Sequence, residues 1–296
     1  MNKYFWSMVL CLLVSLPVYA CDACGCVGAA GLSLMPHQQS SFVGLSWQSL
    51  RFRGASTAFQ DIDHFQLASL QLNWRVVEKL QLLVIVPYRM NSTQFNDPYN
   101  RSNGLGDMSL MAQYRLIPGS PISLSPIKHV LDVGLGVKLP TGKFQNEGLA
   151  NSLPTNYQLG SGSLDYLGRV RYHLSRGNWN FQLDVFGRLT TINSQEYRFG
   201  DQLSIHSFAG YWHRRVGYSV MLYTGLYAEY MSQDVNKGFY QLFTGGNGQY
   251  ISTGIETLLG GNYSLGVNFQ PPISQNYAQG DIVAKSRFQF RFNYLF

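Results

Sequence analysis

The sequence predicts an all-β fold, a closed antiparallel transmembrane β-barrel of about 12 strands that follows a short N-terminal segment. Three observations support this prediction: a composition rich in aromatic residues but poor in charge, an alternation of apolar and polar residues, and an alternation of long and short connections. Of the 296 residues, 13% are charged and 14% are aromatic. A soluble domain carries about 25% charged residues, so this surface is unusually poor in charge.

The composition excludes several classes of protein. Mean hydropathy is −0.09, and beyond the first 20 residues the longest apolar run is Leu82 to Pro87. This run is far shorter than the roughly 20 residues of a membrane helix. A disordered chain, an ordinary cytosolic protein and a helical membrane protein are therefore excluded. The net charge of +6 does not predict a nucleic-acid partner, because the 22 basic residues form no cluster with a binding motif.

The first 20 residues have the three parts of an export signal. Lys3 provides the positive start, Phe5 to Leu16 form the apolar core, and Val18 to Ala20 form a cleavage site with small residues. The apolar core is too short to stop transfer as a membrane helix. We therefore divide the chain into a signal peptide, a cysteine-containing N-terminal segment and a barrel, at 1–20, 21–39 and 40–296.

Beyond about residue 40, apolar and polar residues alternate with a period of two, which is typical of strands with two different faces. In the last strand, one face carries only aromatic residues: Phe288, Phe290, Phe292, Tyr294 and Phe296. The alternating stretches run for about ten residues, and aromatic residues such as Trp47 and Trp179 flank them. Strands of a soluble sandwich are shorter and turn aliphatic faces inward. The pattern therefore favours a transmembrane barrel over a sandwich.

The predicted connections alternate in length. Those after odd-numbered strands are long and polar, at about 54–63, 91–105, 144–162, 192–200, 234–248 and 274–284. Those after even-numbered strands are mostly tight, as at Arg75 to Lys79, and Gly119 to Lys128 is a longer exception. Barrels of the Gram-negative outer membrane have long extracellular loops, short periplasmic turns and both termini in the periplasm. We therefore expect two partners, the outer-membrane bilayer and the barrel assembly machinery, which would recognise the last strand ending in Phe296.

Three cysteines, Cys21, Cys24 and Cys26, follow the predicted cleavage site with the spacing CxxCxC. Three thiolates so close together can converge on one soft metal ion, so copper or zinc is the candidate cofactor. Two alternatives remain open: Cys21 as a lipidated N-terminus, and a disulfide between Cys24 and Cys26 in an oxidising compartment. The small, apolar stretch Gly28 to Leu34 is suited to packing into the barrel mouth as a short plug.

Ten charged residues are predicted to point into the lumen from the polar faces of the strands. They are Asp107, Arg115, Asp132, Lys138, Asp165, Arg169, Arg171, Asp184, Arg188 and Glu256. One interpretation is an ion-pair network that fills a modest barrel. The other is a charged lining that sets pore selectivity, as charged rings do in channels. In the second interpretation, the arginines of two neighbouring strands would form a mildly anion-favouring wall.

The sequence contains no catalytic motif, so we expect no enzyme. The stretch GSGSL lacks the spacing of a nucleophile elbow, and Gly142-Lys143 lacks the flanking residues of a phosphate loop. The six histidines show no HxxxH pairing. His206 and His213 lie seven residues apart, which places them on opposite faces of a strand.

Four stretches resemble a family of bacterial outer-membrane proteins named after the meta pathway of phenol degradation. They are GLGDMSLMAQYRL from Gly104, LGVKLPTGKF from Leu135, GSGSLDYLGRVRYHL from Gly160 and YRFGDQLSI from Tyr197. The resemblance covers about residues 65–296 and implies a barrel that takes up small hydrophobic or aromatic compounds. The cysteine segment 21–39 departs from the core of that family.

Two functions follow as hypotheses. The first is an outer-membrane transporter or channel for small solutes, with hydrophobic or aromatic compounds as candidates. The second is a protein that binds copper or zinc through its CxxCxC segment and uses the barrel as an anchor.

Overall fold

The computed structural model describes residues 40–54, 62–93, 101–118, 126–144 and 157–296. Strands make up most of this part of the chain, and none of its helices is long and apolar enough to cross a membrane. The predicted export signal and the cysteine segment lie outside the described residues.

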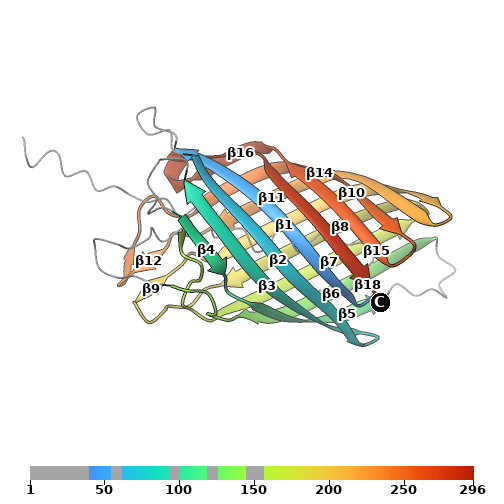
Figure 1. The fold of residues 1–296 in the computed structure, drawn as a ribbon, viewed down its shortest axis with the longest axis horizontal. Helices are drawn as coiled ribbons and strands as arrows, with labels where there is room; N and C mark the ends of the chain where they lie inside the picture. Colours follow the sequence, from blue (N-terminus) through green and yellow to red (C-terminus); the bar gives the residue numbers. More distant parts are fainter. Residues whose placement is uncertain (1–39, 55–61, 94–100, 119–125, 145–156) are drawn as a thin grey trace, which may run out of the picture.

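Twelve long antiparallel strands form the wall of a closed barrel (Figure 1). Each strand pairs with the next along the chain, and pairing of the first with the last closes the ring. The strands are β1 (Phe42–Gly54), β2 (Ile62–Val77), β3 (Leu80–Thr93), β5 (Ser109–Pro118), β6 (Ile127–Lys138), β7 (Asp165–Arg176), β8 (Trp179–Leu189), β10 (Gln202–Arg215), β11 (Tyr218–Met231), β14 (Gly246–Leu259), β15 (Tyr263–Gln270) and β18 (Arg287–Leu295). The predicted fold class and strand number are confirmed.

The two ends of the barrel differ, and we call them the turn end and the loop end. At the turn end, four pairs of neighbouring strands are joined by connections of two or three residues, at 78–79, 177–178, 216–217 and 260–262. Here the N–H of Phe296 donates to the carbonyl of Ser41, at 2.9 Å, beside the seam between β1 and β18. The longer connections gather at the loop end, on the left of Figure 1, except the one that joins Pro118 of β5 to Ile127 of β6 at the turn end. The alternation predicted from the sequence therefore exists, and it separates two ends of different character.

Several predicted loops contain strand structure. Three short strands extend the barrel wall: β4 (Arg101–Leu105), β16 (Pro272–Tyr277) and β17 (Ile282–Ala284), with a 3₁₀ turn, Ala278–Gly280, between the last two. Three more form a small separate sheet at the loop end: β9 (Tyr197–Arg198), β12 (Val235–Asn236) and β13 (Phe239–Tyr240). These segments have only two to six residues each, too few for the alternation used to find strands to show.

The two faces of the wall have opposite chemistry. Along β18, Phe288, Phe290 and Tyr294 are exposed, whereas Arg291 and the polar residues between the aromatic ones are buried. The same alternation runs around the ring, with Leu135 at 73% and Trp179 at 62% exposed on the outer face. An apolar outer face around a polar interior is typical of a barrel that sits in lipid, because closure leaves no unpaired strand edge.

Candidate functional site: the barrel lumen

The inward side chains fill the barrel in two chemically different zones, which together are the candidate site. Charged residues predominate along β5 to β8. An aromatic cluster occupies the loop end of the lumen, between β1, β2, β11, β14, β16 and β17. This cluster consists of Leu50, Phe52, Phe65, Leu67, Tyr157, Tyr227, Met231, Tyr250, Tyr277, Ala278, Ile282 and Ala284.

The structure brings the predicted lumen residues together as ion pairs. All of them except Arg188 are buried, and Arg188 has only 11% of its side chain exposed. Five are cations and five are carboxylates. The pairs within this set are Arg115–Asp132 (2.8 Å), Arg171–Asp132 (2.9 Å), Lys138–Asp107 (2.9 Å), Lys138–Asp165 (2.7 Å), Arg169–Asp184 (2.5 Å) and Arg188–Asp165 (3.7 Å).

The arginines of β7 and β8 do not form the anion-favouring wall that one interpretation of the sequence suggested. Arg169 donates to Asp184 from both Nε and Nη2. Arg171 reaches Asp132 on the neighbouring strand, and Arg188 faces Asp165. The reason is geometric: antiparallel pairing places Arg171 directly opposite both Asp132 and Asp184. Each arginine therefore has a carboxylate beside it.

Asp107 also holds the connection between β6 and β7 against the barrel wall. Its carboxylate accepts hydrogen bonds from the backbone N–H groups of Gly142 and Ser161, and from the Ser161 hydroxyl. Lys138 donates to the same carboxylate and to the Ser161 hydroxyl. Residues on both sides of the connection between β6 and β7 are thus held inside the barrel at the loop end of β6.

Tyr157, in the same connection between β6 and β7, packs into the aromatic cluster. Its ring lies 5.4 Å from the ring of Phe65, and its hydroxyl donates to Asp63 at 2.5 Å. Its carbonyl accepts hydrogen bonds from Asn91 and Ser102 on β3 and β4. An aromatic side chain that is 4% exposed thus narrows the loop-end mouth of the barrel from within.

The polar centre of the aromatic cluster is a buried ion pair surrounded by three tyrosines. Arg287 donates to both carboxylate oxygens of Glu229, and the hydroxyls of Tyr227 and Tyr277 donate to the same carboxylate. The guanidinium also lies 4.0 Å from the ring centroid of Tyr250 and donates to its hydroxyl. A buried charge is tolerated when such contacts replace water, and here Glu229 and Tyr250 supply them to the guanidinium.

These residues were not selected from the sequence, although one signal pointed to some of them. Arg287 and Arg291 lie four residues apart on the polar face of the last strand, so their inward direction follows from the alternation. Arg291 is the partner of the predicted residue Glu256, at 2.9 Å. Glu229 and Tyr227 lie two residues apart on β11, but Tyr250 and Tyr277 lie on β14 and β16, and nothing in the sequence shows that these strands bring them together.

The loop end carries a further acidic site at the start of β10. Asp201 accepts hydrogen bonds from the backbone N–H of Thr190 and from Arg198, at 2.8 and 2.7 Å. Burial by itself would raise the pKa of the Asp201 carboxyl, but these hydrogen bonds outweigh burial and hold its pKa below the ordinary value. The carboxylate therefore remains charged at neutral pH and joins the end of β8 to the segment before β10.

No metal centre can be built from the described residues. Within the ranges that the structure covers, no three His, Cys, Asp or Glu side chains come together in a way that could hold an ion. The predicted ligands Cys21, Cys24 and Cys26 lie outside those ranges, so the copper or zinc site stays a prediction.

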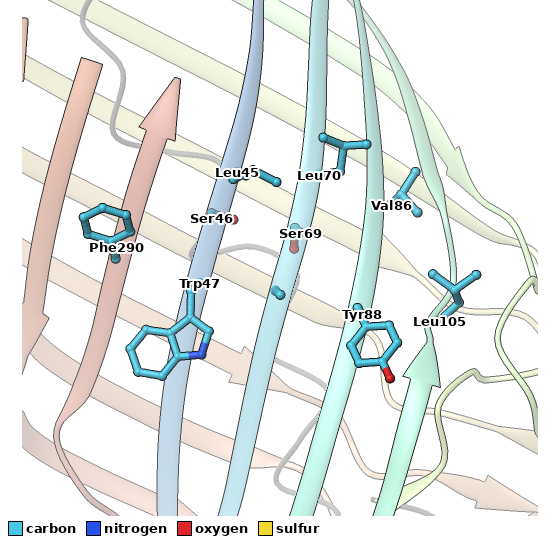
Figure 2. Close-up of a pocket in the computed structure, with 10 residues that line it drawn as sticks. Leu45, Ser46, Trp47, Ser69, Leu70, Val86, Tyr88, Leu105 and Phe290 are labelled. Atoms are coloured by element: carbon cyan, nitrogen blue, oxygen red, sulfur yellow. The ribbon is translucent and has the colours of Figure 1, made fainter. Parts of the chain in front are cut away.

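A shallow groove of about 400 Å³ lies on the outer face of the wall (Figure 2). Trp47 and Tyr88 project on either side of it, and Phe290, Leu70 and Leu105 complete its apolar lining. The groove exists because the residue between Trp47 and Tyr88 across the strands is a small alanine, Ala68.

No family model matches the chain, and no curated protein matches it. Among solved structures, an outer-membrane channel from Pseudomonas putida F1 is similar, with a TM-score of 0.64 and 13% identity, over 89% of this chain and 97% of that chain. The β domain of the Bordetella autotransporter BrkA has a TM-score of 0.47 and 12% identity, over 87% of this chain and 100% of that chain. At these identities the likeness shows only the fold, which is a closed antiparallel barrel.

Proposed function

We propose that the protein is an outer-membrane β-barrel that transports small, uncharged solutes of aromatic or hydrophobic character. The observation that carries the proposal is the aromatic cluster inside the lumen. A barrel that conducts hydrated ions gains nothing from burying Phe52, Phe65 and Leu67 on its inner face. An apolar solute gains the free energy of leaving water there, about 25 cal/mol for each Å² of apolar surface that is covered.

The charges of the lumen support the same proposal. Because the predicted lumen cations lie beside carboxylates, a permeating ion would have to compete with ion pairs that are already formed. An uncharged solute does not disturb them. The resemblance of four sequence stretches to the phenol meta-pathway proteins favours the same class of solute, and the apolar outer face supports insertion in the outer membrane.

Uptake by intact cells tests this function. The probe N-phenyl-1-naphthylamine fluoresces when it enters a membrane, and a lipopolysaccharide surface slows its entry. We expect cells that display the folded protein to take up the probe faster than cells that lack it. Equal rates in the two would contradict the proposal. In planar bilayers we expect the purified protein to conduct small ions only weakly.

The second candidate function depends on the cysteine segment alone. We propose that Cys21, Cys24 and Cys26 bind copper or zinc, because three soft ligands within six residues favour these ions. Elemental analysis of purified protein, compared with the Cys24→Ser/Cys26→Ser variant, tests this. Equal metal content in both would contradict it. An intact mass would also show whether Cys21 carries lipid and where the signal peptide is cleaved.

A further inference from the structure

One seam of the barrel loses its backbone pairing over a short interval. Strands β15 and β18 pair as far as Gln270 and Arg287, and β16 and β17 pair again only at Tyr277 and Ile282. Between these two points, residues 271–276 face residues 283–286 without a ladder pair. Both edges of this interval remain paired on their other sides, β16 to β14 and β17 to β1. The wall is therefore continuous on both sides of a local break.

The sequence explains why the ladder is interrupted here. Pro271 and Pro272 have no N–H group, so neither can donate across the seam. The interval also has six residues on one strand and four on the other, and the register between β14 and β16 shifts beside it. Unequal lengths cannot be paired residue by residue.

A side chain closes the break in place of the backbone. The amide of Gln275 donates from Nε2 to the carbonyl of Ala284 at 3.1 Å, and its Oε1 accepts from the N–H of Ala284 at 2.5 Å. Both polar groups of one backbone residue are thus satisfied by one glutamine. A rotamer change of a single side chain breaks both bonds, whereas opening a regular seam breaks a whole ladder.

The break separates the aromatic cluster and its polar centre from the apolar outer face of the wall. On the inner side, Tyr277 and Arg287 bound it, and both belong to the group around Glu229 in the aromatic cluster. On the outer side, Ile273 is 55% and Phe288 is 50% exposed. The outer groove begins two residues from Phe288, at Phe290 (Figure 2).

We propose that this seam is a lateral portal, held shut by Gln275, through which an apolar solute passes between the aromatic cluster and the surrounding lipid. The proposal rests on the proposed transport of hydrophobic solutes and specifies their route. A solute with greater affinity for lipid than for water has no reason to cross the whole polar lumen toward the turn end. It can instead leave through the wall, where unpaired backbone groups would be costly in lipid unless a side chain satisfied them.

Gln275→Ala tests the portal, because it removes both bonds to Ala284 and leaves the backbone unchanged. Gln289→Ala is the matched control: Gln289 is an inward glutamine of the same wall, but its backbone is paired with Gln48 on one side and Asn268 on the other. Heat-modifiable gel mobility establishes that both variants are folded. The initial rate of N-phenyl-1-naphthylamine uptake by intact cells is then compared with ion conductance in planar bilayers.

We expect Gln275→Ala to raise the uptake rate about tenfold, the factor that corresponds to the loss of two neutral hydrogen bonds from the closed state. Uptake by Gln289→Ala and ion conductance in both variants should match the wild type. If the two variants and the wild type take up the probe equally fast, and faster than cells without the protein, the portal is refuted while the transport function stands. If even the wild type equals cells without the protein, the transport function itself fails. Equal acceleration in both variants, or a parallel rise in ion conductance, would indicate general or axial opening and would also refute the portal.

Discussion

Substitution of Glu229 by glutamine gives the sharpest test of how the lumen is stabilised. In the wild type this carboxylate accepts two hydrogen bonds from Arg287 and one each from two tyrosine hydroxyls, with 2% of either charged side chain exposed. A glutamine at this position removes the negative charge. Its NH₂ group also replaces one of the two oxygens that accept hydrogen bonds from the arginine and the tyrosines. The guanidinium then stays buried with no carboxylate beside it.

Removing one partner of a buried ion pair costs about 3–5 kcal/mol of the free energy of unfolding. Arg287 keeps the face of Tyr250 at 4.0 Å, and a desolvated cation–π contact contributes about 2 kcal/mol. Because that contact survives in the variant, we place the expected loss for Glu229→Gln near the lower limit, at about 3 kcal/mol.

Reversible urea unfolding of the protein in lipid vesicles, followed by tryptophan fluorescence, measures this difference. The control is Arg198→Met, which breaks a pair with 43% and 33% of its side chains exposed and should cost less than about 1 kcal/mol. The double variant Glu229→Leu/Arg287→Met should recover part of the loss, since it leaves no buried charge. A free energy of unfolding for Glu229→Gln within about 1 kcal/mol of the wild type would refute the argument.

Three further predictions concern other parts of the barrel. Asp132→Asn leaves two buried arginines without their shared carboxylate, so we expect a loss of about 3 kcal/mol in urea unfolding and a higher anion conductance in planar bilayers; unchanged values would contradict the ion-pair assignment. Gly225→Val places a Cβ 1.9 Å from the Ser207 carbonyl, so heat-modifiable mobility should show little folded barrel, whereas Gly168→Val, with open space around its Cβ, should fold normally. The lowered pKa of Asp201 means that its contribution to stability is present above the ordinary carboxyl pKa and is lost as the pH falls below about 4. Pepsin cleavage at the loop end, measured relative to cleavage of an unfolded substrate at the same pH, should therefore increase as the pH falls through that range in the wild type and stay constant in Asp201→Asn; equal pH profiles would refute the role of this carboxylate.

The strands of the membrane-spanning wall could be predicted because lipid imposes a strict rule on them. Every second residue must be apolar, so the aromatic face from Phe288 to Phe296 and the number of strands follow from the order of residues. β4, β16 and β17 have only three to six residues each, too few for the alternation to show, which is why they were taken for loops. The break between β16 and β17 could not be predicted from the sequence either, because pairing depends on how two separate segments align.

The inward direction of the charged residues follows from the same alternation, but their partners do not. Whether Arg171 stands free in a pore or beside Asp132 depends on the register between β6 and β7, which the tertiary structure sets. The aromatic cluster depends on barrel closure, because only a closed ring brings Phe52 of the first strand within 6.1 Å of the Tyr277 ring near the end of the chain.

The sequence by itself determined that this chain forms a barrel with an apolar outer surface, about how many strands it has and which side chains point inward. The reason is that these properties repeat locally, every two residues and every connection. Only the tertiary structure decided that the inward charges neutralise one another, that aromatic residues occupy the loop-end part of the lumen and that one glutamine closes a gap in the wall. Those features arise from residues distant in sequence, and closure of the ring alone brings them together.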